Sequence, residues 1–126
     1  MQIGQVAERT GLSLRTIRHY EEMGLVTPSA RSKGGFRLYT RADVDRLMVV
    51  RRMKPLDFSL EEMRNLLTVL DELSSGGGSD AEREQLRQQL RAFHQVAEAR
   101  CEKLRAQLLA AEDFAATLRH RLDAKD

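Results

Sequence analysis

The sequence predicts an all-α fold with a small β-hairpin wing, and three observations carry this prediction. Three Ser/Thr-x-x-Asp/Glu capping boxes are each followed by apolar residues at helical spacing. A stretch with Pro and Gly separates two short apolar runs in the first third of the chain, as in a hairpin. Residues 80–126 contain neither Gly nor Pro, which is typical of a long helix.

The first two helices are expected to form a helix-turn-helix. Residues 3–9 place apolar side chains on one face, and Gly11 ends this helix. Ser13 caps the second helix, and Gly24 ends it where a left-handed backbone is favoured. Two short helices joined by a tight turn that contains Gly define the motif.

The wing is expected to follow the second helix. Leu25-Val26 and residues 36–39 (Phe-Arg-Leu-Tyr) have the composition of short strands. The loop between them, residues 27–35, contains Pro28 and two adjacent glycines, which are typical of turns. The sequence therefore predicts a hairpin before the third helix.

Two more helices complete a first domain that is expected to span residues 1–72. The capping box at residues 40–43 opens one helix, and Pro55 ends it. The capping box at residues 59–62 opens the other helix. The Ser- and Gly-rich residues 73–79 are expected to form a flexible linker.

The third capping box opens a long helix over residues 80–122, and residues 123–126 form a tail. Apolar residues recur along this helix in steps of three and four, which is the spacing of a coiled-coil seam with one stutter. The seam consists of Leu86, Leu90, Phe93, Ala97, Cys101, Leu104, Leu108, Ala111, Ala115, Leu118 and Leu122. Because a single helix cannot bury its own apolar stripe, we expect a homodimer through residues 80–122.

Charge is divided unevenly along the chain. Residues 1–54 hold eleven Lys/Arg and five Asp/Glu, whereas residues 79–126 hold nine of each. A basic head followed by a neutral helix is typical of a nucleic-acid-binding protein. We find no nucleophile–base pattern, Gly-rich phosphate loop or metal-ligand spacing, so we expect no enzymatic activity.

The sequence also bears on cellular location. No apolar run approaches the ~20 residues of a membrane span, and the first residues lack the features of a signal peptide. The single cysteine, Cys101, allows no intrachain disulfide and suits a reducing compartment. We therefore expect a cytoplasmic protein with no membrane partner.

Four motifs, in order, resemble the signatures of the MerR family of bacterial transcription regulators. They are residues 3–7 (Ile-Gly-Gln-Val-Ala), residues 14–21 (Leu-Arg-Thr-Ile-Arg-His-Tyr-Glu) with Gly24-Leu25, residues 35–39 (Gly-Phe-Arg-Leu-Tyr) and residues 58–62 (Phe-Ser-Leu-Glu-Glu). A lone helix-turn-helix pattern is weak evidence, but four ordered motifs at family spacing are specific. The resemblance covers about residues 1–72. It implies a winged helix-turn-helix DNA-binding domain, followed by a long coiled-coil dimerisation helix that pairs antiparallel with its copy.

The resemblance also implies which residues contact double-stranded promoter DNA. In this fold the second helix enters the major groove, where arginine pairs with guanine edges or neutralises phosphate. Tyrosine hydroxyls suit phosphate contacts, and the wing meets the DNA backbone or minor groove. The expected contact residues are Arg15, Thr16, Arg18, His19, Tyr20, Lys33, Arg37, Tyr39 and Arg52, with Arg51 and Lys54 as extensions. The alternatives are solvated charge at Arg18 and Arg37, and a Tyr20 ring packed in the core with only its hydroxyl exposed.

The resemblance implies a mechanism as well. The dimer is expected to bend and untwist a promoter whose spacer is too long, so that RNA polymerase engages both promoter elements. The alternative is an effector-independent architectural DNA-binding protein, because the sequence has neither the cysteine cluster nor the large drug-binding domain of other members. We expect no cofactor and no metal.

Cys101 lies in the expected seam and has two interpretations. It is either a small buried hydrophobic residue or a thiol sensor, as in some single-cysteine members of the family. Nearby basic residues favour the thiolate, whereas burial opposes it. His94 and Glu98 lie on the same side of the helix and are an alternative small metal site, but such pairs are common on exposed helices.

Overall fold

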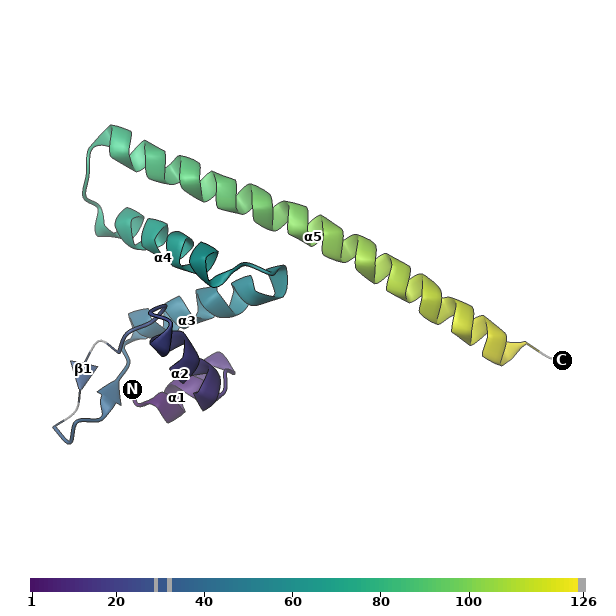
Figure 1. Ribbon diagram of the computed structural model, residues 1–126, viewed down its shortest axis with the longest axis horizontal. Coiled ribbons are helices and arrows are strands. Elements are labelled where there is room, and N and C mark those ends of the chain that lie inside the picture. The colour runs from purple at the N-terminus through teal and green to yellow at the C-terminus, as the bar shows by residue number, and fades with distance from the viewer. Residues whose placement is uncertain (29, 32, 125–126) are drawn as a thin grey trace. The chain divides into compact units, whose positions relative to one another are not determined.

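The computed structural model describes residues 1–28, 30–31 and 33–124 and confirms the all-α fold with a small β-hairpin (Figure 1). The elements in order are α1 (Ile3–Thr10), α2 (Leu14–Glu22), β1 (Ala30–Arg31), β2 (Arg37–Leu38), α3 (Arg41–Met53), the 3₁₀ turn η1 (Lys54–Leu56), α4 (Leu60–Ser75) and α5 (Asp80–Asp123). The two strands pair antiparallel, with Ala30 opposite Leu38 and Arg31 opposite Arg37.

The chain forms two compact units, one from Met1 to Leu90 and the other from Arg91 onward. In the first unit, α1 packs against both α2 and α3, and α3 packs against α4. The apolar core of this unit consists of Val6, Ile17, Tyr20, Leu25, Val26, Tyr39, Val44, Leu47, Val50, Met53, Phe58, Met63, Leu67 and Val69. The second unit is the remaining part of α5.

The helix ends follow the expected local signals. Gly11 and Gly24 both have left-handed backbones, with φ of 70° and 76°. The Ser13 hydroxyl accepts a hydrogen bond from the amide of Thr16, so it caps α2. The expected boxes at residues 40–43 and 59–62 are both complete. In each box, the side chain of the first residue accepts from the backbone amide of the last, and the side chain of the last accepts from the backbone amide of the first. These five local predictions are confirmed.

The prediction of a strand at Leu25-Val26 is wrong. The amide of Leu25 donates to the carbonyl of Tyr20 and so closes the end of α2, while its carbonyl accepts from the Arg46 side chain. Both side chains are almost completely buried, at 0% and 1% exposed, rather than alternating between core and solvent. The wing strand begins only at Ala30.

The expected linker at residues 73–79 is helical in its first three residues. Helix α4 continues through Ser75, and Gly76 then ends it with a left-handed φ of 72°. The guanidinium group of Arg83 donates to the carbonyls of Leu73 at 3.2 Å and Gly77 at 3.3 Å. The bond to Leu73 satisfies one of the carbonyls that the end of a helix otherwise leaves without a partner. The segment between the two helices is therefore residues 76–79.

Helix α5 contains no buried residue within its described span. Several residues of the expected seam are exposed, including Leu104 at 43%, Leu108 at 59% and Leu118 at 50%, and Cys101 is half-buried. From Leu104 onward, the apolar stripe is therefore exposed to solvent in a single chain. In the described part of the chain, no helix is both long and apolar enough to cross a membrane.

Candidate nucleic-acid interface

The exposed side of α2 carries the expected basic residues. Arg15, Arg18 and His19 are solvent-exposed, whereas Ile17 and Tyr20 of the same helix are buried. This division follows the helical period, because the two faces alternate every three to four residues. The helix therefore presents two guanidinium groups and an imidazole away from the core.

Thr16 is half-buried and belongs to the cap of α2. Its hydroxyl accepts a hydrogen bond of 2.8 Å from the Ser13 hydroxyl, and its amide donates to the same Ser13 oxygen at 3.0 Å. Because the Thr16 hydroxyl is the acceptor in this pair, its own hydrogen is not used there. The Thr16 hydroxyl can therefore donate a hydrogen bond to an anionic oxygen placed at the start of α2.

Tyr20 does not have the exposed hydroxyl that we expected for a phosphate contact. The residue is 3% exposed, and its hydroxyl is buried with no hydrogen-bond partner among the described residues. The ring lies beside that of His19, with a distance of 6.0 Å between the ring centroids. Tyr20 is therefore a core residue in this structure. The alternative interpretation, in which the Tyr20 ring packs in the core, fits the structure better, but the hydroxyl is buried as well rather than exposed.

Tyr39 also points inward rather than toward solvent. It is 1% exposed, and its hydroxyl donates a hydrogen bond of 2.9 Å to Oε2 of Glu21. Burial, followed by this hydrogen bond and the Glu21 charge, raises the pKa of Tyr39 to about 12, because all three disfavour the phenolate. The expected role in phosphate contact does not fit this placement, since the hydroxyl is used internally.

Arg37 lies on β2 and forms an ion pair with Glu21 of α2. The distance between Nη1 of Arg37 and Oε1 of Glu21 is 2.6 Å. The Arg37 side chain is 49% exposed and the Glu21 side chain only 15% exposed. Arg37 is therefore held from one side by the protein and open on the other.

Glu21 is a residue of this site that sequence reasoning did not single out. It appears in the sequence only as the end of a motif, and nothing local marks it as different from the neighbouring Glu22. The structure shows that its two carboxylate oxygens are used separately, one by Arg37 and one by Tyr39. The only sequence signal is a pair of adjacent acidic residues after a basic stretch, and it does not tell Glu21 from Glu22.

An open cleft lies between the start of α1, the exposed side of α2 and the wing. It brings Arg18 of α2 and Arg37 of β2 to the same hollow, together with an exposed wing aromatic, Phe36. The cleft is lined by Gln2, Ile3, Arg18, Glu21, Glu22, Gly35, Phe36 and Arg37. Lys33 is exposed in the loop of the wing.

The remaining basic residues of the expected set lie at the end of α3. Arg52 and Lys54 are exposed there, but no described contact brings either of them to the cleft. The Arg51 guanidinium lies beside Gly11, so this end of α3 is next to the turn between α1 and α2. The structure thus joins Arg18 and Arg37 at one site and leaves Arg52 separate from it.

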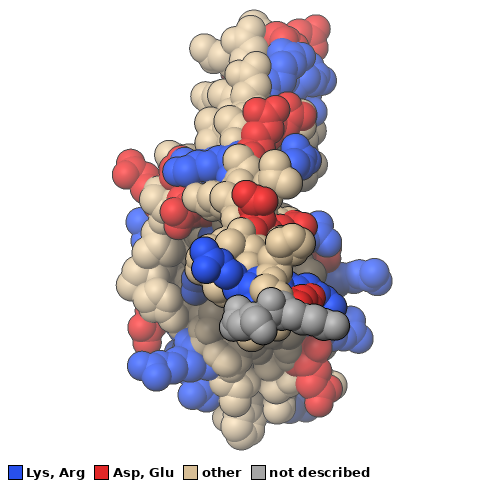
Figure 2. Space-filling model, turned by 90° about the vertical axis from the view of Figure 1, so that its right-hand side faces the viewer, with Lys and Arg blue, Asp and Glu red and all other residues tan. Residues whose placement is uncertain are grey.

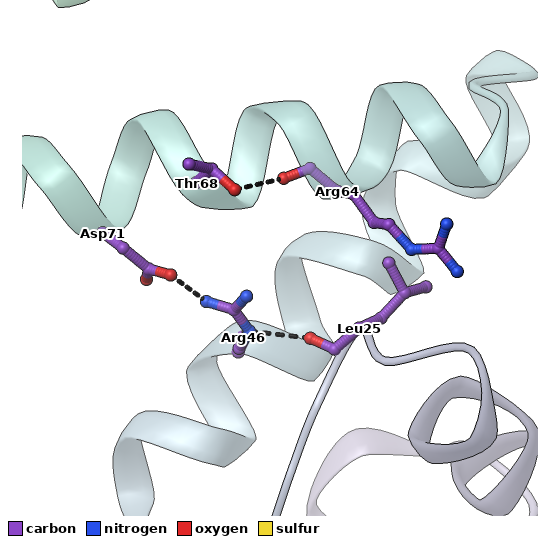
Figure 3. A network of polar contacts seen from close by, with 5 residues as sticks. All are labelled: Leu25, Arg46, Arg64, Thr68 and Asp71. Carbon is purple, nitrogen blue, oxygen red and sulfur yellow. Dashed lines mark hydrogen bonds and ion pairs between the residues drawn. The ribbon is translucent and has the colours of Figure 1, made fainter.

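Two arginines, one from α3 and one from α4, donate to backbone carbonyls just after α2, and Figure 3 shows the contacts of Arg46 with Leu25 and Asp71. Arg46 of α3 donates through Nε to the carbonyl of Leu25 at 2.7 Å and through Nη1 to Asp71 of α4 at 2.6 Å. Arg64 of α4 donates through Nε to the carbonyl of Met23 at 3.1 Å, and its Nη2 donates to the same oxygen. Helices α3 and α4 therefore fix the end of the helix that carries Arg15 and Arg18.

Charges of both signs are interspersed over the face drawn in Figure 2. Lys and Arg are numerous there, but Asp and Glu interrupt them, so this face is not one uniform basic patch.

The described residues contain no group of three or more His, Cys, Asp or Glu side chains that could hold a metal ion. His94 and Glu98, the alternative metal pair, lie 3.2 Å apart between Nε2 and Oε1, and both are more than half exposed. This is an ordinary pair of residues one turn apart on a helix.

Comparison with known proteins connects this geometry to a family. Residues 1–70 match the family model described as MerR HTH family regulatory protein. The mercuric resistance operon regulatory protein of Bacillus cereus is 41% identical over 70 residues, which cover 56% of this chain and 53% of that protein. The chain thus spans about half the length of the curated relatives it matches.

Two solved structures are similar over nearly the whole chain. A transcription regulator from Ralstonia metallidurans CH34 in complex with lead(II) is 31% identical, with a TM-score of 0.57 and coverage of 100% of this chain and 91% of that one. HiNmlR, a MerR family regulator that lacks the sensor domain and is bound to promoter DNA, has a TM-score of 0.60 at 21% identity, covering 96% and 86%. These proteins are regulators rather than enzymes, in agreement with the sequence-based expectation.

Proposed function

Because the chain belongs to the MerR helix-turn-helix family of regulatory proteins, we propose that it is a transcription regulator that binds promoter DNA sequence-specifically as a homodimer. The observation that carries the proposal is the shared cleft, in which Arg18 from α2 and Arg37 from the wing lie at one open site. In this arrangement, an arginine on the helix can enter a DNA groove while an arginine on the hairpin contacts the phosphates along the edge of that groove.

The proposed contacts divide between reading and positioning. Arg15, Arg18 and His19, on the exposed side of α2, enter the major groove and contact base edges or phosphates there. Thr16, Lys33 and Arg37 contact the backbone at the start of α2 and in the wing. Arg52 extends the footprint from the end of α3. Tyr20 and Tyr39 are not part of this proposal, because their hydroxyls face the protein interior.

The dimer is proposed to form through α5. Its 44 residues correspond to a rod of ~66 Å, and its apolar stripe is exposed in one chain from Leu104 onward. An antiparallel pair of such helices buries both stripes and relates the two heads by a two-fold axis, which suits a palindromic operator. The HiNmlR structure supports the DNA-binding part of the proposal, because it shows a protein of this fold bound to promoter DNA.

The regulatory step is proposed to be a distortion of the promoter. Two heads linked by a stiff pair of helices can hold a bent and untwisted DNA site, which costs several kcal/mol by elastic estimates and is offset by the added contacts. RNA polymerase then engages promoter elements that were previously out of phase. This action takes place in the cytoplasm, with the DNA.

Footprinting of the purified protein on the DNA upstream of its own gene tests the proposal. We expect a protected palindromic site with enhanced cleavage at its centre, where the DNA is distorted. Oxidants and divalent metals are added in parallel to detect an effector. A footprint whose pattern none of them changes favours the effector-independent architectural alternative, and no specific footprint at all contradicts the proposal.

A further inference from the structure

An acidic residue, Glu21, connects the wing strand β2 to α2 through two side-chain contacts. Its Oε1 lies 2.6 Å from Nη1 of Arg37, and its Oε2 accepts the Tyr39 hydroxyl at 2.9 Å. Arg37 and Tyr39 lie on and just after β2, so both contacts join the wing strand to the last turn of α2. The carboxylate is mostly buried, with 15% of its side chain exposed.

The contact of Glu21 with Tyr39 strengthens the hold of Glu21 on Arg37. A charge-assisted hydrogen bond is about twice as strong as a neutral one, and the second oxygen is anchored by the nearly fully buried Tyr39. The backbone of Tyr39 is in turn paired with Met1, through its amide and its carbonyl at 2.6 Å and 2.8 Å. Glu21 is therefore held in place itself and cannot follow Arg37 toward solvent without breaking a buried bond.

We propose that Glu21 is a positioning residue for DNA binding, which fixes the wing against α2 and orients the exposed donors of Arg37 toward the DNA backbone. This inference rests on the proposed function. It assigns to an acidic side chain, which DNA repels, a favourable contribution to DNA affinity. The contribution arises because the clamp keeps Arg18 and Arg37 at a constant separation across the cleft.

The sign of one substitution tests this proposal. Glu21→Gln removes a negative charge from the cleft, so long-range electrostatics alone predicts tighter DNA binding. The positioning role predicts the opposite, a loss of roughly tenfold or more in affinity for the footprinted site. It also predicts that the slope of log affinity against log salt shrinks by about 0.9 if one phosphate contact is lost.

Glu22 supplies a matched control. It is the next residue on α2, it lines the same cleft, and it is exposed with no described hydrogen bond or ion pair. Glu22→Gln removes the same charge without touching the wing, so we expect affinity equal to or above that of the wild type. If Glu21→Gln binds DNA as tightly as Glu22→Gln, the positioning role is wrong.

A measurement without DNA separates this proposal from the proposed function. The chain has two tyrosines and no tryptophan, so ultraviolet absorbance follows tyrosine ionisation directly. Glu21→Gln is expected to lower the pKa of Tyr39 from about 12 and to speed amide hydrogen exchange in β2. Both changes remain measurable even if the wild-type chain binds no DNA. Unchanged Tyr39 ionisation and unchanged exchange in β2 overturn the proposed role of Glu21.

If Glu21→Gln does not fold, Tyr39→Phe, which removes only the hydroxyl contact, is measured in its place and is expected to speed exchange in β2.

Discussion

At the scale of single residues, comparing variants of Arg18 and Arg9 distinguishes an arginine that contacts DNA from one that is only solvated. Both are exposed, but Arg18 lies on α2 at the cleft and Arg9 in the last turn of α1. Arg18→Ala is expected to weaken specific DNA binding by about 1–3 kcal/mol, because a base or phosphate partner is lost. Arg9→Ala is expected to change it by much less. Titrations at one fixed salt concentration check this, and equal affinities for the two variants contradict the docking proposed here.

Tyr39 gives a prediction for alkaline pH. Its pKa in the folded chain is about 12, above the ordinary 10.0, so the folded state holds this proton more tightly than the unfolded state. The resulting stabilisation is fully present below about pH 10 and is lost as the pH rises from about 10 to about 12. We expect it to amount to about 2–3 kcal/mol. Denaturant titrations at several pH values should show this loss in the wild type, and a clearly flatter profile in Tyr39→Phe, in which the other groups still titrate.

At the scale of elements, the two bonds of Arg46 are expected to differ greatly in energy. Arg46→Met keeps the apolar stem but leaves the carbonyl of the fully buried Leu25 without its donor, which should cost about 1–3 kcal/mol. Asp71→Asn removes only an ion pair whose acidic side chain is 60% exposed, so the expected cost is about 0–1 kcal/mol. Midpoints of chemical unfolding measure both. An equal loss in the two variants indicates that the link between α3 and α4, rather than the support of α2, is what Arg46 provides.

At the scale of the whole molecule, the seam of α5 predicts which leucines hold the dimer together. Leu108 lies in the seam, whereas Leu109 is rotated by about 100° around the helix, although both are exposed in one chain at 59% and 71%. Leu108→Glu is expected to raise the dimer dissociation constant by roughly two orders of magnitude or more, because it places an unpaired charge between the helices. Leu109→Glu is expected to leave it nearly unchanged. Sedimentation equilibrium distinguishes the two, and a monomeric wild type at micromolar concentration contradicts the dimer itself.

The same symmetry yields a prediction for Cys101. The expected seam from Leu86 to Leu122 is centred on Leu104, so in an antiparallel pair the two Cys101 residues are displaced by about six residues, or ~9 Å. This exceeds the ~7 Å that an unstrained disulfide spans between Cα atoms. We therefore expect mild diamide oxidation to give no rapid covalent dimer on a non-reducing gel. A quantitative covalent dimer that Cys101→Ser abolishes would shift the centre of the pair toward Cys101 and favour the thiol-sensor interpretation.

The helices, their starts and most of their ends could be predicted from the amino-acid sequence because their signals are local. A capping residue meets its partner three positions later, as Ser59 meets Glu62, and a left-handed glycine acts on the turn that contains it. The periodic stripe of α5 is local in the same sense. For this reason the fold class, the helix-turn-helix and the exposed side of α2 were all predicted, along with Arg15 and Arg18 as exposed residues.

The three-dimensional packing determined the features that depend on residues far apart in the chain. Leu25 and Val26 look like a strand in isolation but are drawn into the core, where Arg46, 21 positions later, takes the Leu25 carbonyl. Tyr39 looks like a phosphate contact until it meets Glu21, 18 positions earlier. Whether a polar group faces solvent or the interior is settled by which distant partner offsets the cost of burying it, and no local pattern contains that information.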